Sequence, residues 1–292
     1  MGRVERNTLD SVTDLNLSYT GGQAKKWVHI FFGKLDEIFI QRGVILTFIG
    51  FLLGRALILS QLAPFAIPFF AAVYLLQKNK APYALIGLIA GAATIHVMNA
   101  TIIFAAAIIF MMLHKIREPS LAQQYKLVPM YVFISFGFTN FGMHYIIERK
   151  LLLYDSLMMG VEAGLAFILT LIFIQCIPLI FSSKRSRALR TEEVVSLTIL
   201  IASILTGTIG WTIYDLSFEH ILSRYLVLIF ALSAGAAIGS TVGVVTGLIF
   251  SLASVATLFQ MSLLAFAGLL GGLLKEGRKI GTAAGLLVAT VL

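Results

Sequence analysis

The chain has 292 residues, of which 59% are hydrophobic and only 12% are charged, and its mean hydropathy is +0.93. Such a composition excludes an ordinary water-soluble domain and is typical of a membrane protein. The single cysteine, Cys176, excludes a disulfide framework and a thiolate metal cluster. We interpret the formal net charge of +8 as a determinant of membrane topology and of attraction to anionic lipid, with no nucleic-acid partner.

Residues 1–42 are polar, and they are too long and too charged to be a cleavable signal peptide. Within this cytoplasmic tail, residues 24–41 place apolar side chains such as Trp27 and Phe31 on one arc of a helical wheel and charged ones such as Lys25 on the opposite arc. We predict an amphipathic helix that lies on the inner membrane surface. The alternative is a helix that docks onto a cytoplasmic partner or onto the helical bundle.

Residues 43–292 are predicted to form a multi-span transmembrane domain, because about 20 apolar residues cross a bilayer. The expected fold class is all-α, a polytopic helical membrane protein with about ten spans. We expect helices near 44–62, 64–77, 82–98, 100–114, 127–147, 157–181, 194–214, 225–248 and 251–274, and one that begins at 280. The second to fourth are short, and Pro64 and Pro68 interrupt the apolar run, so a broken or re-entrant pair is an alternative there.

The last apolar run stops at Leu292, before it is long enough to cross a bilayer. We therefore expect a chain that is truncated within its last span.

The loops give the orientation, since Lys- and Arg-rich loops tend to stay in the cytoplasm. With the N-terminus inside, most Lys and Arg residues outside the spans fall on the inner side. The segment 275–279, KEGRK, is left outside by this count of spans. Either that loop is an exception, or the glycine-rich region before it crosses a different number of times.

Glycine recurs at four-residue spacing at two places in the chain. These positions are Gly50 and Gly54 in the first predicted span, and Gly235, Gly239, Gly243 and Gly247 in the segment GAAIGSTVGVVTG. Glycines at this spacing form a groove on a helix in which another helix can lie with the two backbones close together. We interpret them as helix-packing residues, rather than as a substrate path, and the contact could lie within one bundle or between copies.

Two ionisable residues are predicted at membrane depth, where charges are costly and tend to have a role. Arg55 lies in the first span and Glu162 in the sixth, and we hypothesise that they pair inside the bundle. In the alternative interpretation Arg55 extends to a lipid headgroup and Glu162 lies in the membrane interface.

A polar cluster is predicted on the outer face, in YDLSFEHILSRYLV. It consists of Asp215, Glu219, His220 and Arg224. The four-residue spacing places the acidic and the basic side chains on adjacent ridges of a helix. The cluster could be a recognition site or a pH sensor, or simply a solvated helix end.

The remaining aspartates and histidines are dispersed without metal-ligand spacing, and there is no phosphate-binding loop or nucleophile elbow. The sequence therefore predicts no catalytic residue, no cofactor-binding residue and no metal site in this chain.

Five stretches carry a family resemblance: GFLLGRALILSQLAPFAIPFF, VEAGLAFILTLIF, EHILSRYLVL, GSTVGVVTGLI and QMSLLAFAGLLGGLLKEG. Together they resemble the membrane region of the stage II sporulation protein E family of endospore-forming bacteria, from about Gly43 to the end. The resemblance implies a ten-span region in the bacterial cell membrane, located at the asymmetric sporulation septum. It also implies a following cytoplasmic region that contacts the division protein FtsZ and other septal proteins and ends in a PP2C-type protein serine phosphatase.

The family's phosphatase requires Mn²⁺ and dephosphorylates an anti-anti-sigma factor, which activates the forespore sigma factor F. Neither the FtsZ-interaction region nor the phosphatase domain is present in these residues, so no catalytic or manganese-binding aspartate can be assigned to this chain. The resemblance implies a module that holds a sporulation phosphatase in the lipid bilayer at the septum and supports formation of a homo-oligomer. Alternatives are a stand-alone transporter or channel, suggested by the short helices and the charges at depth, or a receptor that senses a ligand through residues 215–224.

Overall fold

The structure is a computed structural model, and it describes residues 43–59, 61–117, 121–148, 153–181, 190–214, 216–253 and 258–291. The predicted amphipathic helix at 24–41 lies outside the described residues. The chain divides between Ile45 and Leu46, and the contacts below belong to the second unit, Leu46–Leu292.

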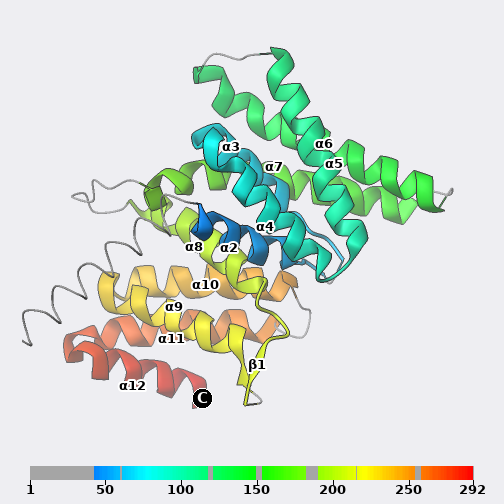
Figure 1. The fold of residues 1–292 in the computed structure, drawn as a ribbon. Helices are drawn as coiled ribbons and strands as arrows, with labels where there is room; N and C mark the ends of the chain where they lie inside the picture. Colours follow the sequence, from blue (N-terminus) through cyan, green and yellow to red (C-terminus); the bar gives the residue numbers. More distant parts are fainter. Residues whose placement is uncertain are drawn as a thin grey trace, which may run out of the picture. The chain divides into compact units, whose positions relative to one another are not determined.

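The described chain is almost entirely helical (Figure 1). Its helices are α2 (Val44–Arg55), α3 (Ala66–Leu76), η2 (Lys78–Lys80), α4 (Ala81–Ala93), α5 (Val97–Arg117), α6 (Leu121–Glu148), α7 (Leu153–Phe181), α8 (Thr191–Thr206), α9 (Phe218–Ala234), α10 (Ala236–Ala253), α11 (Leu258–Leu273), η4 (Leu274–Gly277) and α12 (Arg278–Val291). The strands β1 (Thr212–Ile213) and β2 (Leu216–Ser217) form a short antiparallel hairpin in which Thr212 pairs with Ser217. The predicted all-α class is confirmed.

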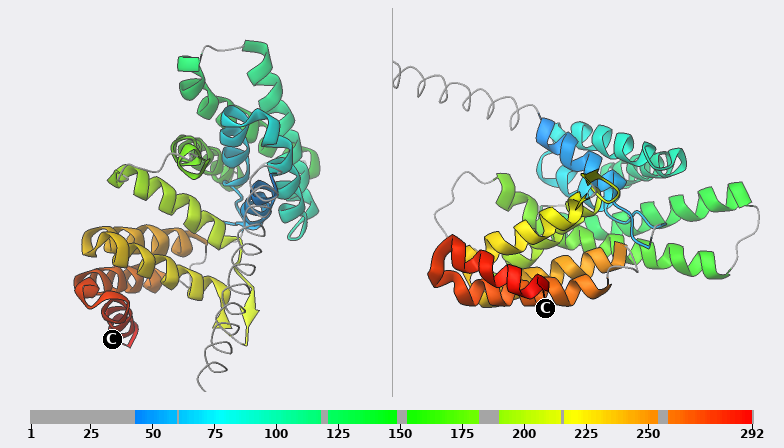
Figure 2. Two further views of the ribbon diagram at one scale, coloured as in Figure 1. Left: turned by 60° about the vertical axis from the view of Figure 1, so that its left-hand side comes forward. Right: turned by 90° about the horizontal axis from the view of Figure 1, so that it is seen from below.

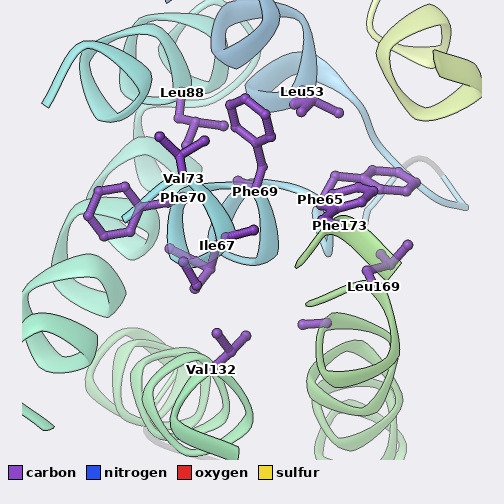
Figure 3. Packing of buried hydrophobic residues seen from close by; sticks show 14 of the residues in the cluster. Leu53, Phe65, Ile67, Phe69, Phe70, Val73, Leu88, Val132, Leu169 and Phe173 are labelled. Carbon is purple, nitrogen blue, oxygen red and sulfur yellow. The ribbon is translucent and has the colours of Figure 1, made fainter. Parts of the chain in front are cut away.

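Helix α3 lies at the centre of the larger hydrophobic core. Each residue from Ala66 to Val73 is buried, as expected for a helix that is apolar on every face. Figure 3 shows Phe69 and Val73 of α3 next to Leu88 of α4. With 11 residues α3 is about 16 Å long, roughly half the thickness of a bilayer core. It is therefore a short helix enclosed by protein.

The segment between α2 and α3 has irregular backbone, yet several of its side chains are buried, including Ala56, Ile58 and Phe65. A backbone N–H or C=O group that is buried away from water needs a hydrogen-bond partner. Internal hydrogen bonds meet part of this requirement, because Ile58 and Leu62 form an isolated bridge and the Leu59 N–H donates to the Leu252 carbonyl at 2.8 Å.

Helices α9, α10 and α11 pack side by side, and the two views in Figure 2 agree with the contacts between them. Helix α9 ends at Gly235, whose φ of 87° is favourable only for glycine. The chain then turns back immediately into α10, so that a Cβ on Gly239 would lie 2.9 Å from the Cα of Ala231. The prediction of one helix over 225–248 is therefore wrong, because a single glycine divides that segment into two antiparallel helices.

Among the residues that the structure describes, three helices are long and apolar enough to cross a membrane by length and composition: Val97–Ile116, Leu153–Leu179 and Ala236–Ala253. Val44–Arg55, Ala66–Leu76 and Lys279–Thr290 are apolar but shorter. Two predicted spans end early for the same local reason, namely that irregular backbone follows. Helix α2 ends at Arg55 instead of 62, and α8 ends at Thr206 instead of 214.

Candidate functional site

Glu162 lies on α7, buried, with 7% of its surface exposed. Its Oε1 accepts a hydrogen bond from the backbone N–H of Ala63, at 2.6 Å, and its Oε2 accepts one from Nδ2 of Asn140, at 2.8 Å. Ala63 belongs to the irregular segment that enters α3, so the carboxylate lies near the positive end of that helix dipole. The Glu162 side chain therefore connects α7 with α6 and with the segment before α3. It also gives a hydrogen-bond acceptor to the Ala63 N–H, which lies outside the helices.

Arg55, the last residue of α2, has a different set of partners. Its Nε donates to the Gly207 carbonyl at 3.2 Å and its Nη1 donates to Oγ1 of Thr94 at 3.1 Å. The guanidinium carbon also lies 5.5 Å from the ring centroid of Trp211, a cation–π distance. Arg55 thereby connects the end of α2 with the end of α4 and with the chain that leaves α8.

The predicted ion pair between Arg55 and Glu162 is absent from the described part of the structure, in which each side chain has the other partners given above. Both residues do lie at connections between elements. The physical reason for the error is that a backbone N–H or C=O can form the hydrogen bond that a charged side chain needs. A pattern of side chains in the sequence does not show where such backbone groups lie.

The glycines of α10 face α11 within the same chain. A Cβ on Gly239 would lie 2.6 Å from the Gly268 carbonyl oxygen, and those on Gly243 and Gly247 would overlap the backbones of Leu264 and Met261. Gly235, by contrast, belongs to the turn before α10. The described contacts of this ridge are therefore intramolecular.

Gly50 and Gly54 of α2 approach the backbone of α4 in the same way. A Cβ on Gly50 would lie 2.6 Å from the Ala84 oxygen, and one on Gly54 would overlap the carbonyl of Leu88. The partner helix contributes its own pair at the same spacing, because Gly87 and Gly91 face the backbone of α2. The crossing thus has small residues on both sides.

The predicted outer polar cluster is only partly within the described residues, because Asp215 lies outside them. Glu219 and His220 are half-buried in the first turn of α9, and Arg224 is exposed. The Nε2 of Gln260, on α11, lies 2.8 Å from Nδ1 of His220. This partner was missed at the level of sequence, since 40 residues separate the two positions.

A cavity of about 360 Å³ lies beside Glu162. Its walls come from the segment between α2 and α3, the start of α5, the end of α6 and the start of α7. Its polar lining residues are Gln61, His96, Asn99, Asn140, His144, Tyr154, Asp155 and Glu162. Of these the sequence singled out only Glu162, although Asn140, a polar residue within a predicted span, was a signal that could have been used.

Within the part of the chain that the structure describes, no group of three or more His, Cys, Asp or Glu residues is arranged to hold a metal ion. The cavity instead offers hydrogen-bonding groups and two carboxylates within a largely apolar wall.

Comparison with known proteins gives the relationship. The family model described as "SpoIIE, N-terminal domain" matches residues 1–292. Stage II sporulation protein E of Bacillus subtilis (strain 168) is 46% identical over 279 residues, which cover 93% of this chain and 34% of the relative. The protein of the same name from Priestia megaterium is 65% identical over 52 residues, 18% of this chain and 9% of that protein.

The chain thus spans about a third of the length of the Bacillus relative, which covers nearly all of it. No solved structure matches the chain. The family match extends over the glycine crossings, the Arg55 contacts and the cavity, and the chain therefore belongs to the stage II sporulation protein E family, as its N-terminal domain.

Proposed function

We propose that this chain is the membrane-embedded module that anchors a sporulation phosphatase at the asymmetric septum and supports its self-association. The observation that carries the proposal is the family match over residues 1–292, in a chain whose described part contains three helices of membrane-spanning length. The close glycine crossings and the buried irregular segment are further support, since both are characteristic of helical membrane proteins.

We propose a multi-pass topology with the N-terminus in the cytoplasm, in which each helix from α5 to α11 crosses once. The turn at Gly235 adds one crossing to the count made from sequence. The basic segment 275–279 then lies on the same side as Lys78–Lys80 and the α5–α6 connection. A Cβ on Gly235 would be 3.1 Å from Nζ of Lys275, which supports the same side for those two residues. With this topology all the major basic loops obey the positive-inside tendency.

Catalysis belongs, in this proposal, to the longer protein of which this chain covers the N-terminal domain. Dephosphorylation of an anti-anti-sigma factor, the requirement for Mn²⁺ and the contact with FtsZ are all proposals for regions other than residues 1–292. The contribution of this chain is to concentrate that activity at one membrane site.

Self-association must use a surface other than the glycine faces described above, because these are occupied within one chain. Exposed apolar side chains on α6, such as Met130, Phe138 and Phe141, provide an unoccupied surface for it within the described residues. Tight packing between such faces is the main source of helix association in lipid.

The test is a fluorescent fusion of residues 1–292 in a sporulating Bacillus host whose own copy is deleted. We expect the fusion to resist extraction by carbonate and to concentrate at the asymmetric septum. A fusion of residues 1–42 alone is the matched control, and it is expected not to form a septal band. Uniform membrane fluorescence of the 1–292 fusion would contradict septal localisation, and release by carbonate would contradict membrane insertion.

A further inference from the structure

The cavity beside Glu162 has an acidic lining. Asp155 and Glu162 both contribute to it, while no Lys or Arg is among the described residues that form its walls. Among its polar lining residues Glu162 and Asn140 are buried, whereas Gln61, His96 and Tyr154 are exposed. The lining therefore combines exposed polar groups with a buried carboxylate.

The carboxylate of Glu162 is held in place from two sides but is not saturated. Each oxygen accepts one hydrogen bond, from Ala63 or from Asn140, whereas a carboxylate oxygen can accept about two. Because Glu162 lines the cavity, its carboxylate oxygens can accept further hydrogen bonds from a molecule bound there. Because an ionised carboxylate in apolar surroundings is costly without a positive partner, this geometry favours a cation with hydrogen-bond donors.

The rest of the lining distinguishes an organic cation from a metal ion. A Zn²⁺ or Ca²⁺ site gathers three or more protein ligands, and the described residues provide no group of three or more His, Cys, Asp or Glu for one. Leu57, Ile102, Phe136 and Met158 provide apolar walls that fit a short hydrocarbon chain. An ammonium group needs only two or three acceptors, and the cavity contains them.

We propose that this cavity is a binding site for a primary ammonium group carried on a small hydrocarbon chain, with Glu162 as its acceptor and Asp155 as a second negative charge nearer the surface. Such a group occurs both on free amines and on the ethanolamine headgroup of a phospholipid. The proposal does not depend on the septal role, because it concerns binding by the isolated membrane protein.

The test uses the purified full chain in phosphatidylglycerol nanodiscs and propylammonium chloride as probe, with binding measured by isothermal titration calorimetry at constant ionic strength. We expect saturable binding of propylammonium and none of 1-propanol. Glu162→Gln is expected to weaken binding at least about tenfold, because a charge-assisted hydrogen bond becomes a neutral one. Asp155→Asn, at a half-exposed position, is expected to fold and to weaken binding less.

Glu192→Gln is the matched control, since it removes one carboxylate from the exposed first turn of α8, away from the cavity. The thermal unfolding midpoint of each variant shows whether it is folded. Equal affinity in the wild type, Glu162→Gln and Asp155→Asn would overturn the proposal, as would the absence of saturable binding.

A second arm distinguishes the two sources of the ammonium group. In nanodiscs that contain phosphatidylethanolamine, competition that lowers the apparent affinity for propylammonium assigns the site to the lipid headgroup. Unchanged affinity assigns it to a free amine. Both results support the site, and neither depends on where the protein localises in the cell.

Discussion

The backbone N–H of Ala63 and the carboxylate of Glu162 lie 99 positions apart in the chain and form a 2.6 Å hydrogen bond in the buried core. The donor belongs to the irregular segment that precedes α3, and the acceptor is a side chain of α7. One carboxylate thereby fixes the path of the chain into the most buried helix of the protein.

Replacing Glu162 by Ala is expected to destabilise the protein by about 2–6 kcal/mol, since it leaves two buried donors without an acceptor at about 1–3 kcal/mol each. Glu162→Gln is expected to cost less, because its amide oxygen can accept from Ala63. A double-mutant cycle with Asn140→Ala, measured by denaturant titration in micelles, is expected to give a coupling of about 0.5–3 kcal/mol. Additive effects of the two substitutions would contradict the bond between these side chains.

Replacing Gly239 and Gly243 by Leu is expected to unfold the α10–α11 pair, because each new side chain would collide with the backbone of α11. Even Gly243→Ala is expected to lower the midpoint of thermal unfolding. Gly160→Ala is the matched control, since a Cβ at Gly160 on α7 meets nothing within 4 Å. A Gly243→Ala variant as stable as Gly160→Ala would show that the crossing is not as close as described.

Arg55→Lys is expected to cost about 1–3 kcal/mol, because an ammonium group cannot reproduce the planar set of donors that reaches Gly207 and Thr94. The tryptophan fluorescence of a Trp27→Phe background, which leaves Trp211 as the single tryptophan, reports the loss of the cation–π contact. Arg224→Lys, at an exposed position of α9, serves as control. An unchanged emission spectrum in Arg55→Lys would argue against that contact.

Single cysteines test the added crossing. In a Cys176→Ala background, Leu216→Cys and Gly277→Cys introduce thiols at exposed sites, one in β2 and the other in η4. With the proposed topology, a membrane-impermeant maleimide labels residue 216 in intact cells and reaches residue 277 only after lysis. Labelling of both positions in intact cells would place them on one side and contradict three crossings between them.

The long helices could be predicted closely from the sequence. The expected spans at 127–147 and 157–181 correspond to Leu121–Glu148 and Leu153–Phe181, because largely apolar segments of that length favour helices. The break at Gly235 could not be predicted in this way. The break depends on the positive φ of Gly235, in a segment that is apolar on both sides. The other glycines of that segment pack against α11, so the sequence does not distinguish the glycine of the turn from the glycines of the helix crossing.

The candidate site was harder to predict, and the reason is chemical. Half of the hydrogen-bond partners of Arg55 and Glu162 are backbone groups, Gly207 O and Ala63 N–H, which every residue carries and which no pattern of side chains identifies. Asn140 was accessible to reasoning, since an amide within an apolar span needs a partner. Its pairing with Glu162 still required the packing of α6 against α7.

The crossing of α2 and α4 has a consequence for the register of the two helices. One Cα hydrogen of each of Gly50, Gly54, Gly87 and Gly91 points along the direction that a Cβ would take, toward a carbonyl oxygen of the other helix. These four Cα–H···O contacts are each weak, but a shift of one residue would replace a glycine by Phe51 or Leu88 at the point of closest approach and force the helices apart. In lipid, where apolar surface gives little preference for one neighbour over another, such steric exclusion is what selects a single alignment.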